Sequence, residues 1–377
     1  MLYADVMKML VASLCSVSYT KGEFKTQKEA KYMLYIGMDV HKRTLQVCVL
    51  DESGTRRIDT KIANDKKDLL DFFDRFSSQA SVALEASHNW GMIYDLLKDV
   101  GHDVHICHSR EARLIGMSRV KTDRNDALRL ALLLKGDLLP EAYVPSIDCR
   151  ELRELVRSRA SLRRMGTRFK NRIHAILTNN WIRHNYSDLF GVKGRQFLRG
   201  LEISEGKKMI VISNLEMLES TERQITYLEE EIKHRAHLDL RAMLLTTIPG
   251  IAEFTALVIL SEIGDISRFY RAESLVSYAG LHPSEDSSGE SVRRGHITKE
   301  GSRWLRWVLV EAAQHAIRQQ GKIQDLYLRL LPKKGHNRAI VAAAREMLVS
   351  IFYMLLRMEP YRPDGKSRIH AVTSEAR

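Results

Sequence analysis

The most restrictive feature of this 377-residue sequence is a run of three apolar stretches separated by two short polar turns near its beginning. Residues 32–65 read YMLYIGMDVHKRTLQVCVLDESGTRRIDTKIAND, in which β-branched and aromatic residues recur and HKR and DESG interrupt the pattern. Short strands bounded by such turns pair as an antiparallel meander. The segment therefore predicts three consecutive strands of one sheet, beginning at Met33.

The following residues alternate between helical and strand patterns. KKDLLDFFDRFSS and NWGMIYDLLKDVG have helical spacing, whereas SVALEAS and HDVHICH are short apolar stretches typical of buried strands. Three antiparallel strands followed by alternating helices and strands predict an α/β domain with a mixed sheet covered by helices, over residues 33–150. Residues 1–32 precede this pattern and are predicted to be an N-terminal extension.

The remaining sequence has a helical pattern. Residues 151–240 are predicted to be a helical coiled-coil linker, because Leu218, Ile225 and Ile232 are seven residues apart. This spacing suits either an antiparallel hairpin or a dimeric coiled coil, and we expect part of an oligomer interface here. Residues 241–360 are predicted to be a mostly α C-terminal domain, followed by a polar tail at 361–377.

The C-terminal domain begins with MLLTTIPGIAEFTALVILSEIG, two apolar helical stretches around a Pro-Gly turn. This is similar to a helix-hairpin-helix element, in which backbone N–H groups at a helix N-terminus bind a phosphate. An ordinary turn between core helices is an equal alternative. Further along, LHPSEDSSGESVRRGHITKEG is predicted to be a polar loop.

The charge balance indicates a polyanionic partner. Lys and Arg total 59 against 47 Asp and Glu, a formal net charge of +12, which is typical of proteins that bind nucleic acid. The four cysteines form no C-x-x-C pair, so neither a disulfide framework nor a zinc site is indicated, and a reducing cytoplasm is expected. No stretch reaches the roughly 20 uninterrupted apolar residues of a membrane span, so no membrane partner is predicted.

Four acidic residues occupy positions where their side chains can converge. Asp39 ends the first predicted strand, Glu85 ends a later one, and Asp123 and Asp126 lie three apart, on one face, at a helix start. Clustered carboxylates repel one another unless cations neutralise them, and Mg²⁺ or Mn²⁺ prefers such oxygen ligands. A pair of these ions can promote phosphodiester chemistry.

Each acid also has a plain structural explanation. Asp39 can terminate a strand, Glu85 can be a surface carboxylate, and Asp123 can be an N-cap with Asp126 favoured by the helix dipole. The metal site is favoured because Asp39 and Glu85 follow apolar strands, where an unpaired charge is costly. The neighbouring basic side chains are then predicted to contact phosphate, together with exposed arginines of the first long helix: Arg119, Lys121, Arg124, Arg163, Arg164 and Arg168.

The motifs YIGMDVHK, ALEAS, VKTDRNDA, IPGI and YAGLHPSEDSSGES, in this order, resemble the insertion-sequence-110 family of transposases, the DEDD-type serine recombinases. The likeness covers residues 35 to about 356. It implies a RuvC-like domain of the RNase H fold, a coiled-coil section and a C-terminal transposase domain with a catalytic serine. By this resemblance the DEDD tetrad is Asp39, Glu85, Asp123 and Asp126.

The family's serine lies after a GLxP turn and directly before a glycine, which indicates Ser288, with Ser287 as the main rival. A serine nucleophile needs a small neighbour, here Gly289, and nearby cations for the developing charge. Those cations are predicted to come from Arg293, Arg294, His296 and Lys299. A merely polar loop is the alternative.

The resemblance implies that the protein cuts and rejoins the DNA of its element through a serine–phosphate intermediate. It also implies guidance by a non-coding bridge RNA. Base pairing then selects the sequence, and the protein itself need only bind the backbone of nucleic-acid helices through charge and shape. A homo-oligomer, dimer or tetramer, in a bacterial or archaeal cytoplasm at the nucleoid is expected. The alternatives are a metal-dependent endonuclease of the Holliday-junction-resolving type and a non-catalytic nucleic-acid-binding protein.

Overall fold

The computed structural model describes residues 34–76, 79–87, 89–108, 111–112, 115, 122–288 and 291–363, with only the backbone described at 285–288 and 291–294. The predicted extension at 1–32 and the tail beyond Pro363 lie outside the described residues. The chain divides into two compact units, one ending at Val144 and the other beginning at Pro145. This division lies six residues before the predicted end of the α/β domain at residue 150.

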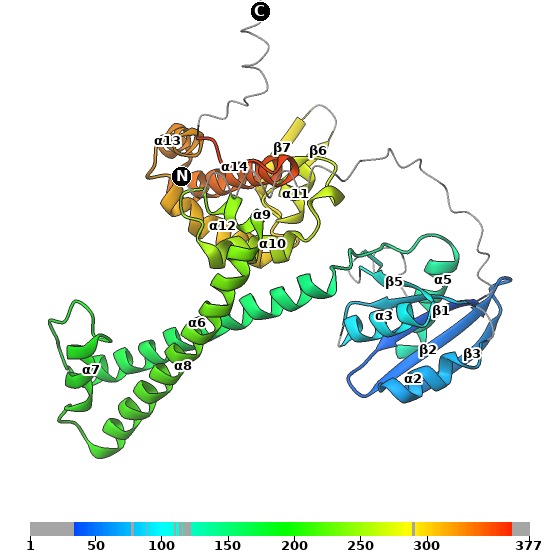
Figure 1. Ribbon diagram of the computed structural model, residues 1–377, viewed down its shortest axis with the longest axis horizontal. Coiled ribbons are helices and arrows are strands. Elements are labelled where there is room, and N and C mark those ends of the chain that lie inside the picture. The colour runs from blue at the N-terminus through cyan, green and yellow to red at the C-terminus, as the bar shows by residue number, and fades with distance from the viewer. Residues whose placement is uncertain are drawn as a thin grey trace, which may run out of the picture. The chain divides into compact units, whose positions relative to one another are not determined.

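The first unit contains a mixed five-stranded sheet, as predicted (Figure 1). The strand order is β3-β2-β1-β4-β5, so the first strand is central. The pairs β1–β2 and β2–β3 are antiparallel, whereas β1–β4 and β4–β5 are parallel, an arrangement compatible with an RNase H-like domain. The strands are β1 Leu34–Val40, β2 Thr44–Asp51, β3 Arg56–Ala63, β4 Ser81–Glu85 and β5 Asp103–Cys107.

Helices cover both faces of this sheet. On one face α2 (Lys66–Phe73) and α3 (Trp90–Asp99) bury Leu69, Phe72 and Leu97 against apolar side chains of β1, β2 and β4. On the other face lies α5 (Asp123–Lys135), whose Ala127 and Ala131 pack against β2. The helix that carries two of the predicted acids is therefore fixed to the sheet that carries the other two.

Gly37 in the middle of β1 determines how closely α5 approaches the sheet. A β-carbon at this position would lie 2.0 Å from the carbonyl oxygen of Ala127 and 2.5 Å from the backbone nitrogen of Ala131. Both distances are far below van der Waals contact, so only glycine allows the backbones of β1 and α5 to meet. The small side chains of α5 at this contact serve the same purpose.

The second unit is mostly helical, as predicted. Its elements are α6 Ile147–Asn179, α7 Val192–Arg199, α8 Glu205–Leu238, α9 Leu240–Leu245, α10 Glu253–Ile263, the 3-10 turn η1 Ile266–Arg268, α11 Ala272–Tyr278, β6 Pro283–Ser288, β7 Ser291–Ile297, α12 Arg303–Ala316, α13 Lys322–Lys334 and α14 His336–Arg357. The predicted polar loop is thus partly wrong, because β6 and β7 pair as an antiparallel hairpin.

The long helices α6 and α8 form an antiparallel helical hairpin, one of the two predicted alternatives (Figure 1). The beginning of α6 meets the end of α8, where Val156 and Ile232 share a core, and Lys170 Nζ lies 3.8 Å from Glu222 Oε1 further along. Leu218, Ile225 and Ile232 are all buried. Coiled-coil packing and a dimer stay predictions.

An ion pair with a buried carboxylate joins α6 to the C-terminal helices. The carboxylate of Glu262 on α10 is 3% exposed, and Arg157 Nη2 on α6 lies 2.6 Å from its Oε1. Ser302 Oγ, at the start of α12, donates a 2.9 Å hydrogen bond to Oε2. Because an unpaired charge here would cost several kcal/mol, these partners tie the three helices together. The separation of residues 151–240 from 241–360 as domains stays a prediction.

The predicted helix-hairpin-helix stretch folds as α9, a turn and α10. Gly250 in the turn has a φ of 88°, and a β-carbon there would lie 2.4 Å from the carbonyl oxygen of Ala312 on α12. Packing against α12 therefore accounts for the glycine, and phosphate binding stays a prediction. Among the described residues, α14 is the one helix long and apolar enough to cross a membrane, and 61% of its apolar window is buried within the unit.

Replacing Gly37 by alanine tests the contact between β1 and α5. We expect the added methyl group to push α5 from the sheet and to lower the free energy of unfolding of the first unit by about 2–3 kcal/mol, as overpacking does. Hydrogen exchange of residues 34–50 measures this loss locally. Gly206→Ala is the control, because no heavy atom lies within 4 Å of its added β-carbon. Equal exchange in both variants would contradict the contact.

Candidate active site

Sheet topology and one helix start bring the four predicted acids to one edge of the sheet. Met38 of β1 pairs in parallel with Leu84 of β4, so Asp39 and Glu85 follow at the same strand ends. Helix α5 begins at Asp123, and the side chain of Thr122 caps it by accepting a 3.2 Å hydrogen bond from the backbone nitrogen of Asn125. The explanation of Asp123 as an N-cap is therefore wrong, and its carboxylate is left for another role.

His41 lies between two of these carboxylates. Its Nε2 is 3.1 Å from Asp39 Oδ2 and 3.2 Å from Asp123 Oδ1. Lys61 Nζ of β3 approaches Asp123 Oδ2 at 3.9 Å. Asp39, His41 and Asp123 each offer an atom within 4.8 Å of the others, a spacing that suits ligands of a single metal ion.

Arg129 joins the other two acids. Its Nη2 lies 2.9 Å from Asp126 Oδ1 and 3.7 Å from Glu85 Oε1. All three side chains are less than one-fifth exposed. The buried Nε of Arg129 has no hydrogen-bond partner within the described part of the chain.

The pKa of Asp39 responds both to burial and to the charges of its neighbours. Burial is the main cause that raises this pKa above its usual value, and His41 opposes the rise. The negative charges of Asp123, Asp126 and Glu85 raise it further. A carboxyl group with this set of neighbours holds its proton more tightly, and a cation placed among the acids would favour ionisation.

The donor set is compatible with a divalent metal ion. Asp39 and Asp123 offer the oxygen ligands that Mg²⁺ and Mn²⁺ prefer, and a neighbouring imidazole such as His41 suits the transition metal better. When bound, such an ion supplies positive charge next to a phosphate. Glu85 and Asp126 complete the acidic edge through Arg129.

Sequence reasoning missed three residues of this cluster. His41 lies in the turn between β1 and β2, and its position two residues after Asp39 is the signal that could have identified it. Lys61 lies beside the site because Asp39 pairs with Gln46 and Gln46 pairs with Lys61 across three strands, a relation fixed by register. Arg129 follows Asp126 by three residues and therefore shares its helix face.

The predicted nucleic-acid contacts are only partly described. Arg119 and Lys121 lie outside the described residues. Arg124 is exposed, and its Nε lies 3.7 Å from Asp59 Oδ1. Lys299 is exposed after β7, whereas only the backbone of Arg293 and Arg294 is described.

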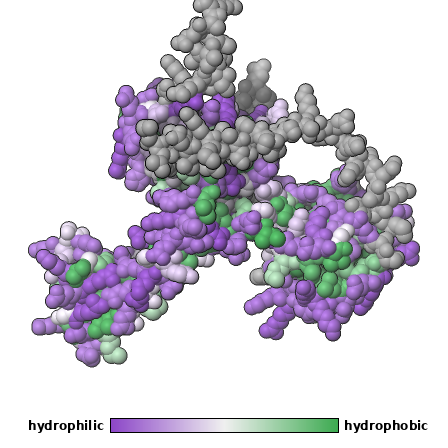
Figure 2. All heavy atoms as spheres, viewed as in Figure 1, coloured by the Kyte–Doolittle hydropathy of each residue, from purple (hydrophilic) through white to green (hydrophobic). Residues whose placement is uncertain are grey.

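The arginines of α6 differ in their surroundings. Arg163 and Arg168 are exposed and form no ion pair within the described part of the chain. The guanidinium of Arg164 instead lies 4.5 Å from the ring centroid of Trp304, which holds it against α12. Figure 2 shows a mostly hydrophilic surface on the viewed face of this hairpin. Phosphate contact by these residues stays a prediction.

Ser288 is the last residue of β6 and pairs with Ser291 across the end of the β6–β7 hairpin. Ser287 pairs with Val292 one step further from the tip. Both serines belong to the second unit, and the acids belong to the first. Gly289 and the side chains of both serines lie outside the described residues, so the choice between them stays a prediction.

Comparison with known proteins agrees with the order of these parts. Residues 36–182 match a family model of DEDD transposases of the IS110 type, described as "Transposase". Residues 242–328 match the model "Transposase IS116/IS110/IS902 family". The two models cover the acidic site and most of the C-terminal helices, respectively.

Individual relatives extend the match over almost the whole chain. The transposase for insertion sequence element IS1111A of Coxiella burnetii is 26% identical over an alignment of 361 residues that covers 90% of this chain and 94% of that protein. The insertion element IS110 43.6 kDa protein of Streptomyces coelicolor is 24% identical over 85% of this chain and 94% of its own. The pilin gene-inverting protein of Moraxella lacunata is 36% identical over 35% of this chain and 41% of its own.

The fold, the acidic site and these matches define a DNA transposase, an enzyme of DNA strand transfer. The chain belongs to the IS116/IS110/IS902 family of transposases.

Metal binding at the acidic site is tested by thermal unfolding. A ligand at 100 times its dissociation constant stabilises the folded state by about 2.7 kcal/mol, so saturating Mn²⁺ should raise the Tm of the first unit by several degrees. Asp39→Asn removes one ligand and should abolish this increase. Asp71→Asn, an exposed carboxylate on α2, is the matched control and should retain it. An undiminished increase in Asp39→Asn would exclude Asp39 as a ligand.

Proposed function

We propose that this transposase is a bridge-RNA-guided DNA recombinase that uses Ser288 as its nucleophile and the DEDD tetrad as its metal site. The observation that carries the metal part is the convergence of Asp39 and Asp123 on His41, with Glu85 and Asp126 joined through Arg129. Four acids held together at the end of a sheet, among basic side chains, suit a site that positions a phosphate.

In the proposed reaction the Oγ atom of Ser288 bonds to the phosphorus and loses its proton, while the bond to the leaving strand's oxygen breaks and that oxygen is protonated to a hydroxyl. Attack by the hydroxyl of a new strand then releases the serine and rejoins the DNA. Asp39, Glu85, Asp123 and Asp126 would hold Mg²⁺ or Mn²⁺, and such an ion would supply positive charge next to the phosphate. The position of Ser288 next to the tip of the β6–β7 hairpin supports its access to DNA.

The positive charge of the chain and its exposed side chains support RNA, DNA and further copies of the protein as partners. The formal net charge of +12 and the exposed Arg163 and Arg168 suit the backbone of RNA and DNA, as expected if base pairing with a guide selects the sequence. The second unit also exposes large apolar side chains near the ends of α6, α7 and α8, namely Trp181, Val192 and Met209. Such exposure supports a homo-oligomer, dimer or tetramer, in which the acidic site of one copy meets the serine of another.

The likeness to a pilin gene-inverting protein supports site-specific recombination as the outcome of the chemistry. The acidic cluster by itself equally suits a metal-dependent endonuclease that cuts Holliday junctions, and this is the alternative. The second alternative is a nucleic-acid-binding protein without catalytic activity, in which the acidic cluster would have no function. We propose that the protein is associated with the nucleoid in a bacterial or archaeal cytoplasm.

Ser288→Ala distinguishes the two enzymatic functions. We expect the variant to lose covalent protein–DNA adducts completely, because no Oγ remains to bond the phosphorus, while it still binds DNA. Denaturing gel analysis of labelled element-end DNA measures the adducts. Ser287→Ala is the control and should retain them.

Adduct formation by Ser288→Ala at the wild-type level would remove Ser288 from the mechanism. Cleavage of a four-way junction that survives in this variant, with no adduct in either protein, would establish the endonuclease instead.

A further inference from the structure

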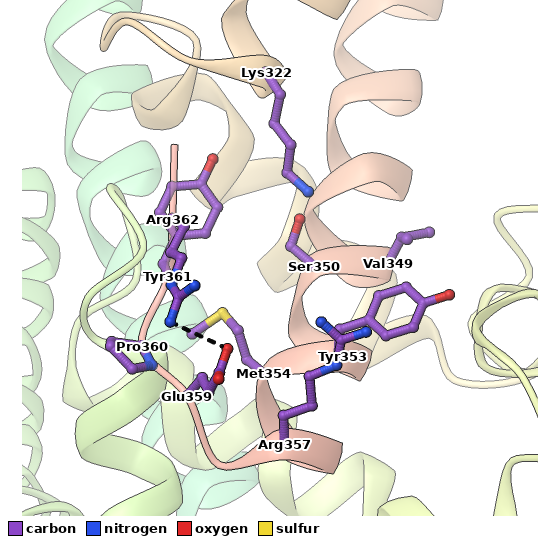
Figure 3. Close-up of a pocket in the computed structure, with 10 residues that line it drawn as sticks. All are labelled: Lys322, Val349, Ser350, Tyr353, Met354, Arg357, Glu359, Pro360, Tyr361 and Arg362. Carbon is purple, nitrogen blue, oxygen red and sulfur yellow. Dashed lines mark ion pairs between the residues drawn. The ribbon is translucent and has the colours of Figure 1, made fainter. Parts of the chain in front are cut away.

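A pocket of about 290 Å³ in the second unit is lined by residues that belong to none of the sites considered so far. It is lined by three segments: the start of α13 with Lys322, the last turns of α14, and the chain that follows α14. Figure 3 shows Lys322 reaching toward Ser350, with Tyr361 and Arg362 on the opposite side from Tyr353. A concave site built from separate segments is typical of a ligand site.

Hydrogen bonds fix the segment that forms one wall. The backbone nitrogen of Tyr361 donates to Thr247 Oγ1 at 2.9 Å, and that of Glu359 donates to the carbonyl oxygen of Met354 at 3.1 Å. The backbone nitrogen of Lys322 donates to the carbonyl oxygen of Pro363 at 3.0 Å. The pocket is therefore preformed, which reduces the entropy lost when a ligand binds.

Three basic side chains line the pocket. Lys322 Nζ lies 3.4 Å from Glu346 Oε1, and Arg362 Nη2 lies 3.4 Å from Glu359 Oε2, both in partly exposed pairs. Such a pair contributes little, so Lys322 can turn to a phosphate at small cost. Arg357 forms no ion pair within the described part of the chain, and its guanidinium lies 5.1 Å from the ring centroid of Tyr353. The pocket thus offers cations to an anion.

The rest of the lining suits a flat ring. Tyr353 is 43% exposed, so part of its ring is open to a ligand. Val349, Met354 and Pro360 supply apolar contact. Burial, and the charge of Glu346, raise the pKa of Tyr361, and its protonated hydroxyl can donate a hydrogen bond to a ligand. Stacking on an aromatic ring beside basic groups is the usual way in which proteins hold an unpaired base.

We propose that this pocket binds one unpaired nucleotide of a nucleic-acid strand, with its base against Tyr353 and its phosphate at Arg357 and Lys322. A pocket of about 290 Å³ lies at the lower end of the range of small-ligand sites, which suits a ligand of the size of one nucleotide. The inference rests on the proposed function, because a guide RNA and a strand opened for exchange both present unpaired nucleotides. The shared chemistry is the unpaired nucleotide, whichever strand supplies it.

The test uses the full chain and oligonucleotides that carry the fluorescent base 2-aminopurine at successive positions. We expect fluorescence to be quenched at one position of a single strand, because the base stacks, and to be unchanged in a fully paired duplex. Separate RNA and DNA strands show which source is bound, and quenching with either supports the proposal. Quenching with neither would overturn it.

Substitutions assign the signal to the pocket. Tyr353→Ala should remove the quenching and weaken single-strand binding about tenfold, whereas Tyr353→Phe keeps the stacking ring and should keep both. Arg357→Gln should remove one phosphate contact, so the slope of log affinity against log salt concentration should fall by about one. Tyr227→Ala, which removes a 70% exposed tyrosine from α8, is the matched control.

Quenching that persists in Tyr353→Ala, or that is lost equally in Tyr227→Ala, would contradict the assignment. The Ser288→Ala protein should quench like the wild type, because the serine is absent from the pocket lining. Failure of the serine mechanism and failure of the pocket therefore give different results.

Discussion

The direct contact between the backbone of α5 and Gly37 of β1 is the constraint on which the acidic site depends. Any side chain at this position would occupy the space of Ala127 and Ala131, and the helix would have to move away from the sheet. Because Asp123 and Asp126 are in the first turn of α5, such a movement would carry both carboxylates away from Asp39 and Glu85. The packing of apolar and small residues thus determines the geometry of a charged site several residues away.

The same contact creates an electrostatic conflict that the surrounding residues reduce. Asp39 is partly buried among three other acids, which raises its pKa, and His41 is the group that opposes this rise. The guanidinium of Arg129 lies 2.9 Å from Asp126 Oδ1 and 3.7 Å from Glu85 Oε1, and its positive charge offsets part of their negative charge. The four carboxylates therefore leave an excess of negative charge at one end of the sheet. A divalent cation can neutralise this excess, which the neighbouring basic side chains offset only in part. The conflict is the physical reason to expect metal there.

Much of this arrangement could be predicted from the sequence, because it depends on local patterns. The strands around Asp39 and Glu85 are marked by apolar residues, and parallel strands end at one edge of a sheet. The three-residue spacing of Asp123 and Asp126 places them on one face of the helix.

The sequence could not predict the position of Lys61 in this way, because that position depends on the register of three strands. The role of Gly37 also required the structure, since a glycine in a strand has several explanations. The sequence did not predict the β6–β7 hairpin at Ser288, because its residues are mostly polar and lack the alternation of apolar and polar residues that marks a half-buried strand.

The most direct test of this account is the anomalous diffraction of crystals soaked in Mn²⁺. The account predicts a peak bound by carboxylate oxygens of both Asp39 and Asp123 at about 2.1 Å, next to His41, with Glu85 and Asp126 lining the same site. In crystals of the Gly37→Ala protein the peak should be lost, because α5 no longer meets β1. A wild-type structure in which Mn²⁺ binds elsewhere, or in which Asp39 and Asp123 do not share an ion, would contradict the account.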